Sequence, residues 1–372
     1  MKSMIAKAFL LAAFVPILLL ASCAPPDAWV TARERIAAEA AKHYEVSLGF
    51  AGDICFADNY VPMEHLAEIG STNIADGIDQ RFIDLMRSMD LMWINNEFCY
   101  SDRGEPLEGK MYTFRGSPSH VTYLDELGID IAGLANNHVF DYGEEAFLDT
   151  LATLEGDNMP YVGAGRNIDE AKAPVYLKAN GLTIAYIAAS CAEYTVYTPE
   201  ATATSPGILL CYDDTLVINA IREARANADY VVVLPHWGVE HSTELESSQI
   251  DSAHAYIDAG ADAVIGGHAH NLQGLEYYNG KPIFYNLGNF WFDDYDVVDT
   301  AVAEIRITGT CDDKGLRLPE SEEVKLVIHP GMQSEVFTSW ADTPEWRSDA
   351  FRRLEDISIN VTIDDDGVVH GQ

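Results

Sequence analysis

The amino-acid sequence predicts a layered α/β fold, because short apolar runs alternate with helical patterns along most of the chain. The apolar runs are continuous, which is typical of strands that are buried on both faces of a sheet. Two Asn-Gly pairs, at residues 180–181 and 279–280, separate other apolar runs and predict β-hairpins. The sheets should therefore contain antiparallel as well as parallel pairs.

The elements can be placed in chain order from these patterns. Buried strands are expected at residues 46–51, 91–94, 129–134, 230–234 and 263–265. Helices are expected between them, at residues 78–89, 118–127, 144–155, 215–227 and 244–259. The first hairpin should join residues 175–177 to 183–187, and the second 275–277 to 282–285. Further strands are expected at 324–328 and 357–363, around a polar stretch at 339–353, and the tail from about residue 311 should be a peripheral part of the same domain.

A targeting segment is expected before the folded domain. Lys2 and Lys7 precede an apolar stretch at residues 8–20, and small residues lead to Cys23, as in a lipoprotein signal peptide. The stretch is short for a transmembrane helix, so we expect cleavage and lipidation at Cys23, with an uncleaved signal anchor as the alternative. Residues 1–22 would then be the signal, 23–43 a lipidated tether and spacer, and 44–372 the domain. This predicts a lipid-anchored protein on the extracytoplasmic face of the cell membrane.

Composition limits the partners of the chain. The chain of 372 residues is 48% hydrophobic, which is ample for a buried core, and its net charge is −36. Such a charge repels nucleic acid, so none is expected as a partner. An anionic substrate would need a local positive centre, which a bound divalent metal would supply. The cysteines show no CxxC spacing, so a disulfide framework is not indicated, although one or two bridges remain compatible with an exported protein.

Polar side chains follow each predicted buried strand. They occur in Gly52-Asp53, Asn95-Asn96-Glu97, Asn136-Asn137-His138, His236-Trp237-Gly238-Val239-Glu240 and Gly267-His268-Ala269-His270. Ligands of open α/β sheets lie outside the carboxyl ends of the strands, so these residues should meet at one edge. The last motif favours metal binding most, because glycine frees the backbone and both imidazoles can turn toward one point or two neighbouring points. The donor set suits Mn, Fe or Zn, and two metals that share a carboxylate would polarise a phosphoryl or carbonyl oxygen.

These motifs, with Asp141-Tyr142-Gly143 and the run from Tyr285 to Phe290, resemble the CapA proteins of poly-γ-glutamate capsule synthesis, which in turn resemble calcineurin-like metallophosphoesterases. The likeness covers roughly residues 44 to 366. It implies a metallophosphatase-like four-layer α/β/β/α sandwich with mixed sheets. It also implies a metal-dependent hydrolase or transferase, acting on an amide or phosphoester bond during synthesis, export or anchoring of the polymer. The alternative is a non-catalytic subunit of a capsule synthesis complex that binds the polymer or assists assembly.

The resemblance also implies roles for individual residues. The implied metal ligands are Asp53, Glu97 as the bridging carboxylate, Asn137, His236, His268 and His270, with His270 on a different metal from the other two histidines. His138 would assist catalysis. The chain departs from the phosphoesterase pattern at two positions, with Cys55 in place of histidine and Glu97 in place of aspartate. The expected number of divalent ions is therefore one or two, and a metal-free site is the alternative. The expected partner is an anionic exopolymer or its precursor.

The remaining candidates are expected beside the ligands, in contact with substrate or in support of the site. Asp141 would hold the His138 ring through a hydrogen bond, or begin the turn before the next helix. Asn136 would fix the turn before Asn137. Asn95, Trp237 and Glu240 complete this set, with Trp237 as a pocket wall and Glu240 as a base or as a partner in a loop salt bridge.

Overall fold

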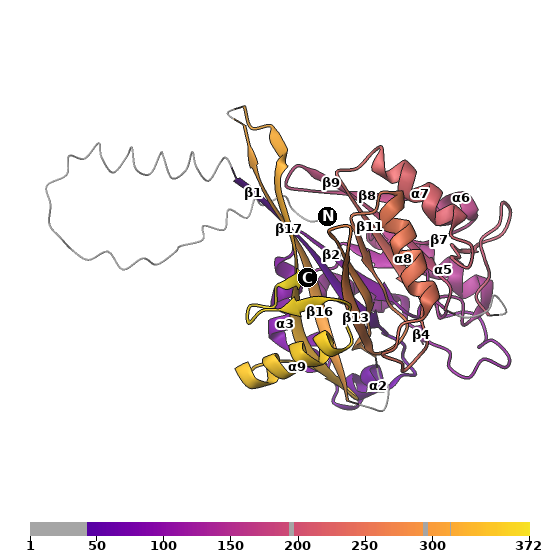
Figure 1. Cartoon of the computed structure of the whole chain (residues 1–372). Helices are drawn as coiled ribbons and strands as arrows, with labels where there is room; N and C mark the ends of the chain where they lie inside the picture. The colour runs from indigo at the N-terminus through magenta and orange to yellow at the C-terminus, as the bar shows by residue number, and fades with distance from the viewer. Residues whose placement is uncertain (1–42, 193–196, 293–296, 313) are drawn as a thin grey trace, which may run out of the picture.

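Two mixed β-sheets pack face to face, and helices cover the outer face of each sheet (Figure 1). The computed structural model describes residues 43–192, 197–292, 297–312 and 314–372. The predicted signal peptide, the lipidation at Cys23 and the tether up to residue 42 lie outside the described residues. Within those residues, no helix combines the length and the apolar character that a membrane crossing requires.

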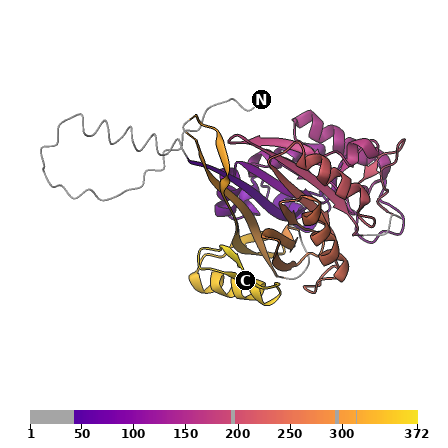
Figure 2. The same ribbon diagram turned by 45° about the horizontal axis from the view of Figure 1, so that its top comes forward.

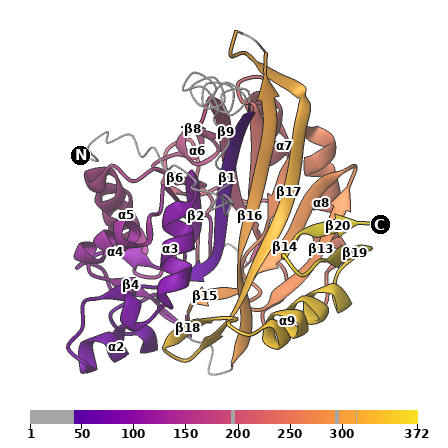
Figure 3. The ribbon, with the colours of Figure 1, turned by 90° about the vertical axis from the view of Figure 1, so that its left-hand side faces the viewer.

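The first sheet has the strand order β18-β17-β16-β1-β2-β5-β6, and β15 also pairs with β1. Its strands are β1 (His43–Ile54), β2 (Leu91–Asn96), β5 (Ile131–Gly133), β6 (Tyr161–Val162), β15 (Asn289–Trp291), β16 (Val298–Cys311), β17 (Arg317–Ser334) and β18 (Phe337–Trp340). Strands β1, β2, β5 and β6 run parallel, whereas β16, β17 and β18 add antiparallel pairs. Figure 3 shows β16 and β17, in orange, lying side by side next to the indigo β1.

The second sheet has the order β13-β14-β12-β11-β9-β8. Its strands are β8 (Val175–Ala179), β9 (Leu182–Ser190), β11 (Tyr230–His236), β12 (Ala263–Ile265), β13 (Leu272–Tyr278) and β14 (Lys281–Leu287). Both predicted hairpins are present, as the antiparallel pairs β8–β9 and β13–β14. Asn180 and Asn279 adopt φ values of 45° and 50°, as the turn of a two-residue hairpin requires.

The helices form the two outer layers. The first sheet is covered by α2 (Val61–Glu68), α3 (Gln80–Ser88), α4 (Thr122–Leu127) and α5 (Gly143–Asp157), and the second by α7 (Thr215–Arg225) and α8 (Ser247–Ala259). Smaller elements are η1 (Ile74–Asp76), η2 (Pro118–Val121), α6 (Ile168–Ala171), β3 (Cys99–Tyr100), β4 (Arg115–Gly116), β7 (Ala164–Gly165) and β10 (Gly207–Ile208). The four-layer α/β/β/α sandwich with mixed sheets is therefore confirmed.

The buried strands are apolar at nearly every position because one face packs against the helices and the other face packs against the second sheet. Along β11, Val231 and Val233 pack under α7 and α8, whereas Val232 and Leu234 pack between the two sheets. Successive side chains of a strand point to opposite faces, so a strand in an inner layer needs apolar residues at every position. The same reasoning applies to β1, where Phe50 faces the other sheet and Ala51 faces the helices.

The tail differs from the sequence prediction. Strand β17 is not peripheral, because it lies between β16 and β18 and places Leu326 and Ile328 in the core between the sheets. The polar stretch forms a helix, α9 (Pro344–Asp356), and only β19 (Val361–Ile363) remains of the last predicted strand, paired with β20 (Val369–Gly371). Helix α9 was missed because its apolar face is narrow, yet Thr343 caps its start and Phe351 and Leu354 reach the inter-sheet core. Figure 2 shows this yellow segment below the sheets.

Candidate metal centre

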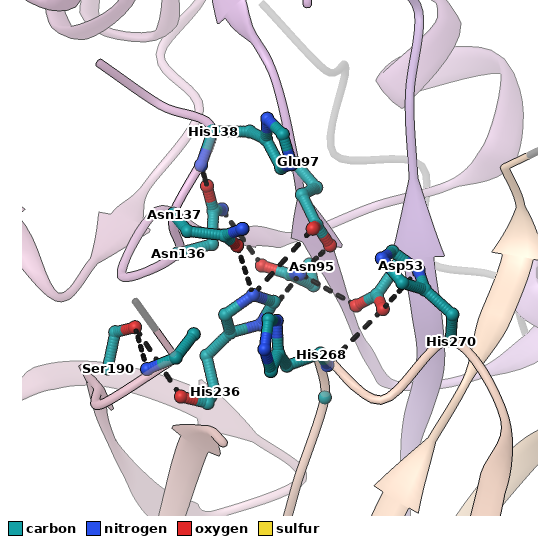
Figure 4. A network of polar contacts seen from close by, with 12 residues as sticks. Asp53, Asn95, Glu97, Asn136, Asn137, His138, Ser190, His236, His268 and His270 are labelled. Atoms are coloured by element: carbon teal, nitrogen blue, oxygen red, sulfur yellow. Dashed lines mark hydrogen bonds and ion pairs between the residues drawn. The ribbon is translucent and has the colours of Figure 1, made fainter. Parts of the chain in front are cut away.

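The predicted polar residues gather where the carboxyl ends of strands from both sheets meet. Asp53 and Glu97 come from the ends of β1 and β2 in the first sheet. His236 ends β11 in the second sheet, and the motif with His268 and His270 follows β12. The sequence analysis expected one edge of one open sheet, so this is a correction. The site lies between two sheets, and an isolated sheet would hold only part of it (Figure 4).

Three of the predicted ligands converge on one point. One ligand atom from each of Glu97, His236 and His268 lies within 4.8 Å of the other two. The three side chains are buried, with exposed fractions of 0%, 3% and 3%. Glu97 Oε1 and His268 Nδ1 have no hydrogen-bond partner among the described residues. Buried polar atoms are normally satisfied, and a cation that accepts lone pairs from oxygen and nitrogen would satisfy this pair.

Amide side chains hold these ligands in place. Asn95 Nδ2 lies 2.7 Å from Asp53 Oδ1, 2.9 Å from Glu97 Oε2 and 3.3 Å from His236 Nδ1. Asn136 Nδ2 donates in turn to Asn95 Oδ1 at 3.0 Å. Asn95 and Asn136 therefore orient the ligands from behind, as outer partners of metal sites do. Neither residue needs to contact substrate for this role.

The turn after β5 places the next pair of residues. Asn136 Oδ1 accepts hydrogen bonds from the backbone N–H groups of His138, at 3.1 Å, and Val139, at 3.0 Å, as expected for a turn residue. The neighbouring Asn137 Oδ1 lies 2.8 Å from His236 Nε2. The amide of Asn137 thus faces the ligand cluster, in the position that the resemblance implies for an amide ligand.

Burial favours the neutral form of each group in the cluster, and metal binding would reverse this preference for the carboxyl groups only. Burial raises the pKa of Glu97 well above its ordinary value, and the nearby Asp53 raises it further. Burial likewise raises the pKa of Asp53. Burial and then neighbouring imidazoles lower the pKa values of His236 and His268, so both rings are neutral. Neutral imidazole is the form that binds metal, and a cation would favour the carboxylate form of Glu97.

The glycine before His268 allows the close approach of these groups. A Cβ atom at Gly267 would lie 3.0 Å from Asp53 Oδ1 and 3.3 Å from His236 Nδ1. His268 adopts a φ of 98°, which a residue with a side chain rarely takes, and its backbone N–H donates to Asp53 Oδ2 at 3.3 Å. Such strained backbone persists where the surroundings fix it, commonly at functional sites. The motif is therefore shaped for the cluster and not for a relaxed loop.

His138 is held by a buried carboxylate. Its Nδ1 lies 2.7 Å from Asp141 Oδ2, and the side chains are 6% and 0% exposed. Asp141 Oδ1 also pairs with Lys110 Nζ at 2.8 Å, and Lys110 donates to the backbone carbonyl of Asn137. The structure thus places Asp141 in the orienting position, while Tyr142 occupies the cap of α5. Sequence reasoning missed Lys110, because it lies in an irregular loop outside every motif.

His270 lies apart from the cluster. Its Nδ1 is 2.7 Å from Asn289 Oδ1 on β15 and 3.8 Å from Asp53 Oδ2. Within the described part of the chain, the three-ligand group includes neither His270 nor Asp53. Cys55 lies in the core under the helices and is not part of the three-ligand group, and burial raises the pKa of its thiol well above the ordinary value. One candidate group of three ligands is thus present in the described residues, and His270 and Asp53 lie beside it.

Of the two remaining candidates, one lies elsewhere than predicted. Trp237 is not a pocket wall, because it points to the opposite face from His236, packs against Tyr256 under α8 and donates to the carbonyl of Tyr285 at 2.8 Å. The alternation of side chains along a strand explains this placement. Glu240 is exposed, and its charge contributes to the raised pKa of Glu97 after burial and Asp53.

The fold is thus a four-layer α/β sandwich whose strand ends bring carboxylate, amide and imidazole groups together as a candidate metal centre. Comparison with known proteins gives its family. The model of the bacterial capsule synthesis proteins PGA_cap matches residues 47–294, and the chain belongs to this family. The resemblance to CapA proteins is thereby confirmed.

Individual relatives carry the corresponding names. The chain is 34% identical over 251 residues to the PGA biosynthesis protein CapA of Bacillus subtilis, covering 67% of this chain and 63% of that protein. It is 38% identical over 176 residues to the capsule biosynthesis protein CapA of Bacillus anthracis, covering 46% and 42%. The chain therefore spans less than two thirds of each relative. Among solved structures, the NAD nucleotidase of Haemophilus influenzae aligns with 86% of this chain and 57% of its own, at 13% identity and a TM-score of 0.43.

Proposed function

We propose that this chain is a metal-dependent hydrolase or transferase that acts on an amide or phosphoester bond during synthesis, export or anchoring of an anionic capsule polymer. The observation that carries the proposal is the convergence of Glu97, His236 and His268 within 4.8 Å, with two buried ligand atoms that have no hydrogen-bond partner among the described residues. The names of the relatives support poly-γ-glutamate or its precursor as the substrate class. The N-terminal pattern at Cys23 supports a lipid-anchored location at the cell surface.

Some residues of the site would bind the divalent ion, and others hold the binding residues in position. Glu97, His236 and His268 would hold one divalent ion, Mn, Fe or Zn, with Asn137 as a further donor. A bound divalent ion supplies Lewis acidity and lowers the pKa of water near it. Asn95 keeps the Glu97 carboxylate and the His236 ring in fixed orientations, so that the ligands need little rearrangement on binding.

His138 is placed to transfer a proton to a leaving group. Asp141 accepts from its Nδ1, which fixes the ring and leaves Nε2 as the atom for proton transfer to a leaving group. The ion pair between Lys110 and Asp141 holds the carboxylate from the other side. Lys110 also brings a positive charge to a site in a chain whose net charge is −36. Together with a divalent ion, this charge would favour an anionic substrate that the rest of the surface repels.

The test combines metal analysis with turnover. The full chain, purified under metal-replete conditions, should contain a divalent ion by elemental analysis and should cleave poly-γ-glutamate or a model phosphoester. His268→Ala should lose the ion, and His138→Ala should keep the ion but lose roughly 10²- to 10⁴-fold in rate. His370→Ala, on a histidine that is 55% exposed and paired with Asp364, is the matched control and should change neither.

Two results would contradict the proposal. A chain that binds no divalent ion at any stage of purification or titration would exclude the metal centre. A chain that binds both ion and polymer, without turnover of either substrate class, would instead be the non-catalytic subunit of a capsule synthesis complex.

A further inference from the structure

We propose that Cys191 and Cys211 form a disulfide. The bond would link the two ends of the chain segment between them, which borders the candidate metal centre. Both cysteines are thiols in the structure, as are Cys55, Cys99 and Cys311. No sequence spacing marks the pair, since the two positions are twenty apart in the chain. The proposal concerns a covalent site outside the ligand cluster; it rests on the proposed extracytoplasmic location but not on the proposed activity.

Backbone register brings the two cysteines together. Ser190 and Leu210 form a parallel β-bridge, in which Ser190 N–H donates to the Leu209 carbonyl at 2.9 Å and Cys211 N–H donates to the Ser190 carbonyl at 3.0 Å. Cys191 and Cys211 are the next pair in this register, so their side chains lie on the same face. Adjacent strands lie about 4.8 Å apart, and disulfides join Cα atoms about 4.4 to 6.8 Å apart.

The side chains meet as the register predicts. The Cys191 and Cys211 thiols lie within hydrogen-bonding reach of each other. Cys211 is 5% exposed in the core under α7 and α8, and the partly buried Cys191 packs against the same core. The contact with Cys191, and then burial, raise the pKa of the Cys211 thiol well above its ordinary value. We therefore expect the more accessible Cys191 to meet an oxidant first.

The chemistry needs a two-electron oxidant, and a small-molecule disulfide such as oxidised glutathione supplies it. Cys191 attacks the small disulfide as a thiolate and releases one thiol, and Cys211 then attacks the mixed disulfide and releases the second. One S–S bond forms between the cysteines, the S–S bond of the oxidant breaks, and the two cysteine protons end on the two released thiols. An extracytoplasmic compartment maintains such oxidants.

The sulfur atoms would lie in the core under α7 and α8, and the backbone of the linked segment borders the candidate centre. Cys191 N–H donates to the carbonyl of the ligand His236 at 3.0 Å. The segment between the cysteines carries Thr198, whose hydroxyl donates to the Asn137 carbonyl at 2.8 Å, and Tyr197, whose hydroxyl donates to the Gly109 carbonyl at 3.0 Å. A disulfide at its two ends would keep these contacts in place by restricting the unfolded chain.

Peptide mapping of the full chain tests the proposal. After incubation with oxidised glutathione, alkylation and digestion, mass spectrometry should find a peptide that links Cys191 to Cys211. Cys55 and Cys99 should stay free thiols that react with the alkylating reagent only once the chain is unfolded. Oxidation should raise Tm by about 5 °C, from the entropy of closing a loop of this length in a chain of this size. Cys311→Ser should keep this rise, and Cys191→Ser should abolish it.

Several outcomes would overturn the proposal. These are free thiols at both positions after oxidation, a glutathione adduct that persists on Cys191, a bond to any other cysteine, and an equal rise in Tm in the Cys191→Ser variant. Because none of these readouts involves metal or turnover, they remain decisive if the proposed activity fails.

Discussion

Replacing Glu97 by glutamine separates two effects of that side chain. The substitution keeps the size of the side chain but removes a negative charge from a carboxyl group that is 0% exposed and lies beside Asp53. A buried charge without full compensation destabilises a fold. Above the ordinary carboxyl pH range, the wild-type chain must either bury the charge of Glu97 or bind a proton there when it folds. The metal-free variant has no such cost and should therefore unfold at a slightly higher temperature than the wild type. Metal binding should change in the opposite direction.

The magnitude follows from the number of ligands and the size of the domain. Loss of the anionic member of a three-ligand group should weaken divalent metal binding on the order of 100-fold, which is about 2.7 kcal/mol. A folded body of about 330 residues has an unfolding entropy of about 0.7 kcal/mol/K. At a metal concentration that saturates both proteins, the metal-induced rise in Tm should be smaller by about 4 °C in Glu97→Gln.

Differential scanning fluorimetry with and without Mn²⁺ or Zn²⁺ measures both effects in one experiment. Glu244→Gln, which makes the same change on an exposed glutamate, is the control and should leave the metal-induced rise unchanged. An unchanged rise in Glu97→Gln would refute the assignment of Glu97 as a ligand. A large drop in the Tm of the metal-free variant would show that the carboxylate stabilises the fold, contrary to the reasoning above.

Three further predictions concern pH, backbone and core. Burial raises the pKa values of Glu97 and Asp53, so the Mn²⁺-induced rise in Tm should grow as pH rises above the ordinary carboxyl range. The metal-free protein should lose stability as pH rises through the ordinary carboxyl range, because the unfolded chain releases those protons first. Gly267→Ala should weaken metal binding about tenfold to hundredfold by calorimetry, while Gly156→Ala, with nothing within 4 Å, should not. Trp237→Phe should lower the free energy of unfolding, measured with denaturant, by about 1 to 3 kcal/mol and leave metal affinity unchanged. The reason is that the hydrogen bond donated by its indole N–H lies in the core.

Much of the fold could be read from periodicity, and the exceptions have physical reasons. Strand β12 has the predicted bounds, and the two hairpins follow from Asn-Gly turns whose left-handed backbone few other residues tolerate. Helix α9 was missed because it is largely exposed and amphipathic on a narrow face. The sequence predicts a peripheral position for strand β17 because its first residues are polar, and only its later residues enter the core.

Local turn chemistry and short motifs were enough to predict which side chains stand at the strand ends and which family the chain resembles. The packing of the sheets was needed to show that two sheets share the site and that Glu97, His236 and His268 converge. It also shows that His270 contacts Asn289 and that Trp237 faces the core. The same holds for Lys110 beside Asp141 and for Cys191 beside Cys211. These contacts join residues far apart in the chain, and their geometry depends on sheet packing and strand register, which no local pattern encodes.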